Sequence, residues 1–308
     1  MTGIIPIDKP AGITSFGAVA RMRKILNMKK IGHAGTLDPM ATGVLPILVG
    51  SATRFLDFLP CKDKRYTAII KLGFTTDTLD TTGEIITHTD AHITRPELDE
   101  AVNCFIGKIS QIPPMYSAVQ KDGVRMYELA RKGVEVEREA RKIEIYKARV
   151  LEFDEGAQEF TLDVSCSAGT YIRTLADDIG KKLGCGACLA GLRRTEGSGF
   201  TLESCYSFEE VAEYAGENRL EKRIISIEDA LMAYPAVYVS EKQAVRFSNG
   251  GELDLIRLKG KYENGLYRIF DPEEVFLGLG EADTDAGFMR ARKVNSNLSG
   301  SPSPQIRI

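Results

Sequence analysis

The chain has 308 residues, 43% of them hydrophobic and 27% charged, so it can bury a substantial core and is not disordered throughout. Its net charge of −3 argues against a general nucleic-acid coat, and it has no run of about 18 apolar residues that could span a membrane. Six cysteines are too few for disulfide bonds to stabilise a chain of this length, and no secretory signal is visible. We therefore expect free thiols in a cytoplasmic protein.

Charge is distributed unevenly along the chain despite the low net value. Residues 1–70 carry ten Lys and Arg against four Asp and Glu, and residues 108–149 carry ten against six. Residues 71–107 carry two against seven, and residues 196–230 carry three against nine. Such blocks can build a basic face on an acidic protein, and a basic face is what a polyanion binds.

The first half of the chain mixes strand and helix patterns. Residues 4–7 predict a short strand, and Thr14 or Ser15 then caps a helix whose apolar positions recur at helical spacing. Residues 66–72 are rich in β-forming side chains and predict another strand. Thr94 begins a capping-box pattern, which predicts the start of a second helix.

The clearest strand pattern covers residues 160–168, where apolar and polar side chains alternate strictly. Alternation implies one solvated face, and therefore an antiparallel or mixed sheet. A helix with one apolar stripe follows, and Gly184 ends it. Arg173 lies beside that stripe in the first turn, so its guanidinium can point away from the core at the end of the sheet. Strands and helices mixed without a βαβ repeat predict an α+β fold.

A second unit is predicted at residues 231–293, where short strand candidates are separated by Gly, Asn and Asp turns. The candidates are residues 236–239, 252–258, 265–270 and 275–281. Their number and spacing predict a small β-barrel. Residues 294–308 are rich in Ser, Pro and Asn and are expected to form a disordered tail.

The densest unusual motif is HAGTLDPMATGVL at residues 33–45. Asp38 lies in it between Gly35 and Gly43, and Pro39 disfavours a helical backbone at Asp38. Glycines permit close approach of another backbone or of a ligand, so the loop is suited to presenting a carboxylate; a plain turn is the alternative. The sequence has no dinucleotide or Walker phosphate loop and no G-x-S-x-G elbow, which disfavours common nucleotide-cofactor enzymes and serine hydrolases.

Five motifs occur in order along the chain. They are DKPAGITS at 8–15, GHAGTLDPMATG at 32–43, KRY at 64–66 with TDTLD at 76–80, CSAGTYIR at 166–173 and LRR at 192–194. Together they resemble the TruB-type tRNA pseudouridine synthases. The resemblance implies a mixed, mainly antiparallel sheet flanked by helices, with a small C-terminal PUA-like β-barrel. It also implies that uridine 55 in the T loop of tRNA is isomerised to pseudouridine, without a metal or organic cofactor.

The resemblance implies roles for individual residues, with Asp38 as the catalytic nucleophile. We hypothesise an ion pair between Asp38 and Arg173, because burial raises the pKa of a carboxylate and a fixed guanidinium opposes that rise. Tyr66 is expected to offer a ring to the target uracil and a phenol for proton transfer, while base flipping exposes the nucleotide. The residues implied to line or shape the nucleotide site are His33, Tyr171, Leu192 and Lys9. A structural, hydrogen-bonded histidine is the alternative for His33.

Residues 115–143 match the RNA-gripping insertion of the family, within a catalytic domain expected at residues 1–230. Lys121, Arg125, Arg131 and Lys132 are the candidate phosphate contacts in this insertion. Residues 231–293 resemble a PUA-type RNA-binding unit only in length and strand spacing. The expected partner is therefore the T-stem-loop of tRNA, bound by a monomer that needs no membrane and no obligatory protein partner.

Two other functions remain compatible with the sequence. A pseudouridine synthase that acts on another RNA under a guide would carry longer basic extensions, whereas the tail here is neutral. A tRNA-folding chaperone would flip and remodel its RNA without needing the catalytic set. The chemical route also stays open, since Asp38 could attack the uracil at C6, attack the ribose carbon, or take a ribose proton to give a glycal.

Overall fold

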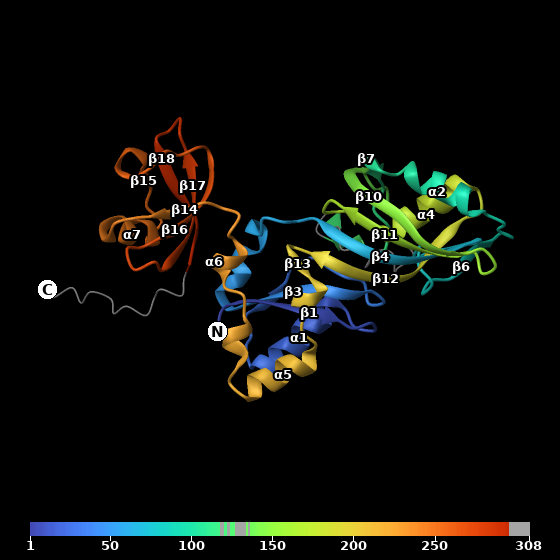
Figure 1. Cartoon of the computed structure of the whole chain (residues 1–308), viewed down its shortest axis with the longest axis horizontal. Coiled ribbons are helices and arrows are strands. Elements are labelled where there is room, and N and C mark those ends of the chain that lie inside the picture. The colour runs from blue at the N-terminus through green and yellow to red at the C-terminus, as the bar shows by residue number, and fades with distance from the viewer. Residues whose placement is uncertain (118–119, 122–123, 127–133, 135, 296–308) are drawn as a thin grey trace.

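The computed structural model describes residues 1–117, 120–121, 124–126, 134 and 136–295. The chain forms a large mixed sheet with helices packed around it, and a smaller curled sheet built from the C-terminal residues (Figure 1). Among the described residues, no helix has the length and apolar character needed to cross a membrane. The architecture is α+β, as the sequence predicts.

The large sheet positions the residues of interest. Its nine strands are β1 (Gly3–Lys9), β2 (Ile31–His33), β3 (Thr42–Val49), β4 (Lys64–Leu72), β7 (Gly107–Gln111), β10 (Arg141–Asp154), β11 (Glu159–Cys166), β12 (Ala187–Gly197) and β13 (Phe200–Thr201). The main order is β1-β3-β12-β4-β11-β10-β7, with β2 beside β3 and β13 beside β12. Every pairing is antiparallel except β12 with β3, so the prediction of a mixed, mainly antiparallel sheet is confirmed.

Helices and short hairpins connect these strands. The helices are α1 (Ser15–Leu26), α2 (Arg95–Asn103), α4 (Ile172–Leu183), α5 (Phe208–Gly216) and α6 (Ile227–Ala230), with 3-10 turns η1 (Gly50–Phe58), η2 (Leu202–Ser204) and η3 (Leu220–Arg223). The hairpins pair β5 (Phe74–Thr76) with β6 (Ile85–His88) and β8 (Gln120–Lys121) with β9 (Val124–Arg125). Thr14, not Ser15, caps α1, because its hydroxyl accepts a hydrogen bond from the Gly17 amide. The predicted capping box at Thr94 is present at the start of α2.

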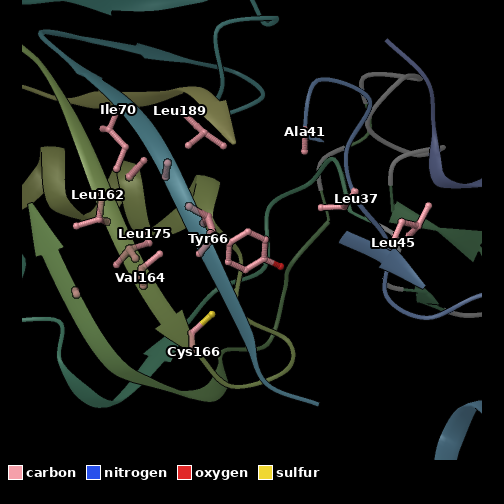
Figure 2. Close-up of a cluster of buried hydrophobic side chains, with 14 of the residues drawn as sticks. Leu37, Ala41, Leu45, Tyr66, Ile70, Leu162, Val164, Cys166, Leu175 and Leu189 are labelled. Atoms are coloured by element: carbon pink, nitrogen blue, oxygen red, sulfur yellow. The ribbon is translucent and has the colours of Figure 1, made fainter. Parts of the chain in front are cut away.

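The main core lies between the large sheet and the helices. Phe160, Leu162 and Val164 of β11 are at most 1% exposed, which confirms the inward face that their alternation predicts. Figure 2 shows Leu162 and Val164 together with Leu175 of α4 in one apolar cluster. This cluster fixes α4 against the sheet, and α4 carries Arg173 in its first turn.

The smaller sheet curls into a half-barrel with strand order β14-β16-β17-β18-β15. Its elements are β14 (Ala236–Tyr238), α7 (Glu241–Ser248), β15 (Leu253–Asp254), η4 (Leu255–Arg257), β16 (Gly265–Phe270), β17 (Phe276–Asp283) and β18 (Phe288–Val294). Only two residues of the strand predicted at 252–258 are extended, since η4 follows them directly. The half-barrel agrees with the predicted PUA-like unit. The exact boundary near residue 231 stays a prediction, and residues 296–308 of the predicted tail lie outside the described part.

Aromatic side chains join the two sheets. Phe276 of β17 lies with its ring centroid 5.9 Å from Phe55 of η1 and 5.6 Å from Phe270 of β16. The Tyr234 hydroxyl also donates a hydrogen bond of 3.0 Å to the Phe58 carbonyl. The half-barrel therefore rests on the side of the large sheet that contains β3 and η1.

Candidate active site

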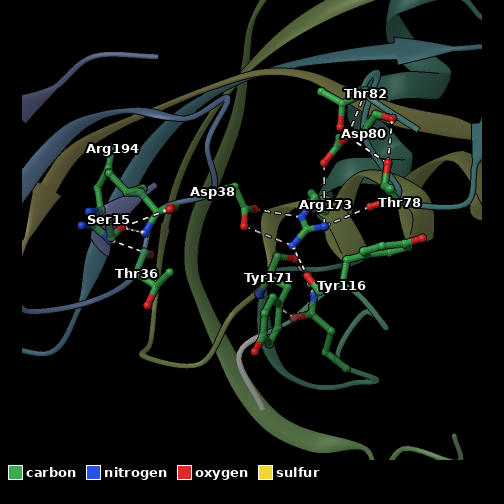
Figure 3. A network of polar contacts seen from close by, with 12 residues as sticks. Ser15, Thr36, Asp38, Thr78, Asp80, Thr82, Tyr116, Tyr171, Arg173 and Arg194 are labelled. Carbon is green, nitrogen blue, oxygen red and sulfur yellow. Dashed lines mark hydrogen bonds and ion pairs between the residues drawn. The ribbon is translucent and has the colours of Figure 1, made fainter. Parts of the chain in front are cut away.

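Asp38 lies in the loop that joins β2 to β3, and its carboxylate faces Arg173. The two atoms nearest each other are Arg173 Nε and Asp38 Oδ2, 3.0 Å apart, and Arg173 Nη2 lies 3.3 Å from Oδ1. The arginine side chain is 6% exposed and the aspartate side chain 34% exposed. Figure 3 shows this bidentate pair, which places a permanent cation against a carboxylate that solvent can still reach.

Arg173 is held by three further groups from other parts of the chain. It donates hydrogen bonds to the carbonyls of Thr78, at 3.1 Å, and Tyr116, at 2.7 Å. Its Nη1 also lies 3.7 Å from a carboxylate oxygen of Asp80, a residue whose side chain is 6% exposed. The guanidinium is buried, and it faces this polar group rather than the apolar stripe of α4 (Figure 3).

Asp80 is a member of the site that sequence reasoning did not single out. Its Oδ1 accepts hydrogen bonds from the Thr78 hydroxyl, at 2.9 Å, and from the Thr82 amide, at 3.0 Å. These bonds aim its other oxygen at Arg173. The TDTLD motif contains this residue, but nothing in the sequence indicates that Asp80 and Asp38 share one arginine.

The environment changes the acidity of Asp38. Burial raises the pKa of its carboxyl above the ordinary 3.8, and the Arg173 cation lowers it again without cancelling that rise. The nearby Asp80 carboxylate also raises this pKa, and Lys9 lowers it. The carboxylate therefore binds protons more readily than a solvated aspartate does, which makes it a stronger base once it is ionised.

Tyr66 lies on β4 with 5% of its surface exposed, at the edge of the main core. Figure 2 shows its phenol oxygen directed to the side on which Leu37 and Leu45 lie. Burial raises the pKa of this phenol to about 12, although a hydrogen bond with Arg194 opposes the rise. The phenol is thus protonated at neutral pH and can donate a hydrogen bond.

The remaining predicted residues surround this centre. Lys9 is fully buried, and its ammonium donates to the carbonyls of Pro10, at 2.9 Å, and Ile13, at 2.8 Å. Burial lowers the pKa of Lys9 to about 8. The expectation that it shapes the site fits its further contact of 3.4 Å with the carbonyl of Pro39, next to the aspartate.

His33, Tyr171 and Leu192 lie on three different elements. His33 ends β2; burial and the Arg194 cation lower its pKa, and its buried Nδ1 has no hydrogen-bond partner among the described residues. A backbone hydrogen bond with Gly35 opposes that lowering of the pKa, so both the pocket role and the alternative of a hydrogen-bonded structural histidine stay predictions. Tyr171 precedes α4, and Gln111 binds both its amide and its carbonyl. Leu192 of β12 is half-buried against the main core.

The predicted RNA-gripping insertion is described only in part. Lys121 ends β8 and Arg125 ends β9, but their side chains lie outside the described part of the structure. Arg131 and Lys132 lie outside the described residues. Their roles as phosphate contacts stay predictions. Among the described residues, no group of three or more His, Cys, Asp or Glu side chains could hold a metal ion.

Three family models match the chain in succession, and they place it in one class of protein, the pseudouridine synthases. They are described as TruB family pseudouridylate synthase (N terminal domain) at residues 23–172, tRNA pseudouridylate synthase B C-terminal domain at 173–232, and Pseudouridine synthase II TruB, C-terminal at 235–287. A protein of Clostridium perfringens (strain 13 / Type A), named tRNA pseudouridine synthase B, is 45% identical over 94% of this chain and 97% of its own. A protein of the same name from Pseudomonas putida (strain GB-1) is 40% identical over 96% of each chain. The chain belongs to the TruB family.

Solved structures agree with this membership. A chain in a Cbf5-Nop10-Gar1 complex superposes with a TM-score of 0.70 at 29% identity, covering 91% of this chain and 78% of its own. A chain in an H/ACA RNP bound to a substrate RNA containing 2'-deoxyuridine gives 0.71 at 26% identity, covering 95% and 84%. Both superpositions cover more than nine tenths of the present chain.

Proposed function

We propose that this protein isomerises uridine 55 in the T loop of tRNA to pseudouridine. The observation that carries the proposal is the bidentate contact between Asp38 and the buried Arg173, in a protein of the TruB family. Relatives that match nearly the whole chain are named tRNA pseudouridine synthase B, which supports tRNA as the substrate.

The chemistry fits the residues present. Isomerisation breaks the bond from uracil N1 to ribose C1′ and joins C5 of the same base to that carbon. A proton leaves C5 and one is taken up at N1, so the atoms balance without an outside group. Asp38 supplies the anionic oxygen that starts the reaction, and Arg173 keeps that oxygen ionised and aimed. Tyr66 lies on the neighbouring β4 with a protonated phenol available to the base.

The target base must leave its stack before Asp38 can reach it. Extruding a nucleotide costs a few kcal/mol, and stacking on an aromatic ring returns about 1–3 kcal/mol per base. We assign this stabilising contact to Tyr66 and place His33, Tyr171 and Leu192 around the flipped nucleotide. Lys121, Arg125 and the C-terminal half-barrel are proposed to bind the tRNA outside this pocket.

The decisive experiment compares Asp38→Asn with the wild type on a T-stem-loop transcript. The amide keeps the size of the side chain and removes its charge, so pseudouridine formation should be lost while RNA binding persists. Asp57→Asn is the matched control, because Asp57 is an exposed carboxylate on η1. Pseudouridine is measured by nucleoside analysis and binding by gel shift. Wild-type turnover in Asp38→Asn would refute the proposal, and a wild-type protein that remodels tRNA without making pseudouridine would favour the chaperone function.

We further propose that the protein acts as a monomer in the cytoplasm, where bacterial tRNA is modified. The Cbf5 chain to which it is similar was solved with the proteins Nop10 and Gar1, whereas the names of the curated relatives mention no partner protein. Turnover by the purified chain alone, at the mass of one chain in size-exclusion chromatography, is the expected result.

A further inference from the structure

Ser15 has an unusual place for a hydroxyl in the first turn of a helix. It is 2% exposed, and the capping bond of α1 is made by Thr14 instead. The Ser15 hydroxyl accepts a hydrogen bond of 2.8 Å from the Leu37 amide and donates one of 3.1 Å to the Leu37 carbonyl. One hydroxyl therefore satisfies both backbone groups of the residue that precedes Asp38.

Arg194 of β12 binds the same loop from another side. It is 1% exposed, and its guanidinium donates to the carbonyls of Val44 at 2.7 Å, Gly35 at 3.1 Å and Thr36 at 3.4 Å. Among the residues that the structure describes, no carboxylate forms an ion pair with it. Its fixed planar fork instead joins both ends of the loop that contains Asp38.

Two glycines, Gly35 in the loop and Gly43 at the start of β3, lie close to Arg194: Gly43 to its backbone and Gly35 to its side chain. A Cβ on Gly43 would lie 2.1 Å from the Arg194 carbonyl oxygen, and Gly43 has a φ of +102°. A Cβ on Gly35, whose φ is +79°, would lie 3.4 Å from Nη1 of Arg194. The close approach that the sequence attributes to a backbone or a ligand is, at these positions, the approach of Arg194.

We propose that Ser15 and Arg194, together called the loop clamp, are positioning residues that fix the direction in which Asp38 presents its carboxylate to the substrate. This inference rests on the proposed function. Figure 3 shows Asp38 between the clamp on one side and Arg173 on the other. The clamp fixes the backbone that carries the nucleophile, and Arg173 fixes its carboxylate, so the side chain has one orientation before RNA binds.

A role in core packing alone does not require an arginine at position 194 or a serine at position 15. Burying a guanidinium without a carboxylate is costly, and an apolar side chain of similar volume fills a core at least as well. Arg194 adds three bonds of fixed geometry to the loop and the start of β3, beside its hydrogen bond with Tyr66, and Ser15 adds two bonds to the loop alone, so Ser15 tests the clamp without touching Tyr66. A displacement of about 1 Å in a reacting group can lower a rate on the order of a hundredfold, so holding this loop affects turnover directly.

The first test compares Ser15→Ala, Ser15→Thr and Ser51→Ala. Loss of the hydroxyl should lower kcat on a T-stem-loop on the order of a hundredfold, with the Kd for that RNA unchanged, because the loop shifts. Ser15→Thr keeps the hydroxyl and should recover most of the rate. Ser51 is the matched control: it is 4% exposed, and its hydroxyl lies 3.5 Å from Asn295 of the C-terminal unit, so its loss should leave kcat unchanged.

The second test separates the geometry of Arg194 from its charge. The chain has three histidines, and the Arg194 cation lowers the pKa of His33, while His88 and His92 are exposed and serve as references. In Arg194→Met, NMR titration should show a raised pKa for His33 alone, together with a lowered kcat. In Arg194→Lys the cation remains but the planar fork is lost, so kcat should fall while the pKa of His33 stays low.

The outcomes are distinct. Thermal unfolding shows which variants fold. If neither Arg194 variant folds, Ser15→Ala alone tests the clamp. If folded Ser15→Ala and Arg194→Lys keep kcat within about threefold of wild type, the clamp is refuted. Failure of the proposed function looks different, because the wild type itself would then form no pseudouridine.

Discussion

Replacing Arg173 should separate catalysis from folding, because this residue contacts Asp38 through two charge-assisted hydrogen bonds. Each such bond is worth about 1.5–3 kcal/mol. Arg173→Lys keeps one cation but not the planar fork, and loss of one bond lowers kcat roughly 10- to 100-fold at 1.36 kcal/mol per tenfold. Arg173→Met loses both bonds and leaves Asp38 and Asp80 without their shared cation. Its kcat should fall by about 10² to 10⁴.

Arg65→Lys provides a matched control for that experiment. Arg65 is also bidentate, with both bonds to Asp163 at 2.9 Å, but its side chain is 43% exposed and does not face Asp38. The Asp163 side chain is 12% exposed, so loss of the planar fork should lower stability, but lysine keeps a cation beside it and this variant should keep wild-type kcat. The assay is single-turnover pseudouridine formation at saturating enzyme. A kcat for Arg173→Lys equal to that of Arg65→Lys would refute the role given to the guanidinium.

Two further results are expected. The rate should fall as pH drops through the pKa of Asp38, because the ionised form is needed, and this acid limb should lie above the ordinary 3.8 since burial raises the pKa. In Arg173→Met the acid limb should lie at a still higher pH, because the cation that lowers the pKa of Asp38 is lost. A wild-type rate that stays constant as the pH falls to 3.8 would contradict the raised pKa of Asp38. Phe276→Ala should cost about 3–5 kcal/mol of unfolding free energy in urea, because the ring is 3% exposed and packs on Phe55. A loss below about 1 kcal/mol would mean that the two sheets do not depend on this contact.

Local features could be predicted because short-range physics determines them. The alternation in β11 and the capping box at Thr94 involve neighbours along the chain, and both are present. The choice between Thr14 and Ser15 as cap could not be made locally, because either hydroxyl fits the pattern. It depends on Leu37, which lies 22 residues further along the chain and forms two hydrogen bonds with the Ser15 hydroxyl.

The site was predictable only where a motif marked it. The pairing of Asp38 with Arg173 followed from the need of a buried carboxylate for a fixed cation, but the direction of the guanidinium did not. Helical spacing places Arg173 beside the apolar stripe, whereas carbonyls of Thr78 and Tyr116 decide where it points. Asp80 was missed for the same reason, since a tertiary contact leaves no periodic signal in the sequence.

The position of β12 has a consequence for how the protein is made. Apart from the two-residue β13, it is the last strand of the large sheet to be synthesised, yet it lies in the middle of that sheet, between β3 and β4. Until Gly197 leaves the ribosome, the nascent chain holds two partial sheets with open edges, and such edges pair readily with other chains. Arg194 belongs to β12, so the loop that contains Asp38 gains its hydrogen bonds to Arg194 only when β12 pairs with both partial sheets. We expect fragments that end before β12 to aggregate and to be inert.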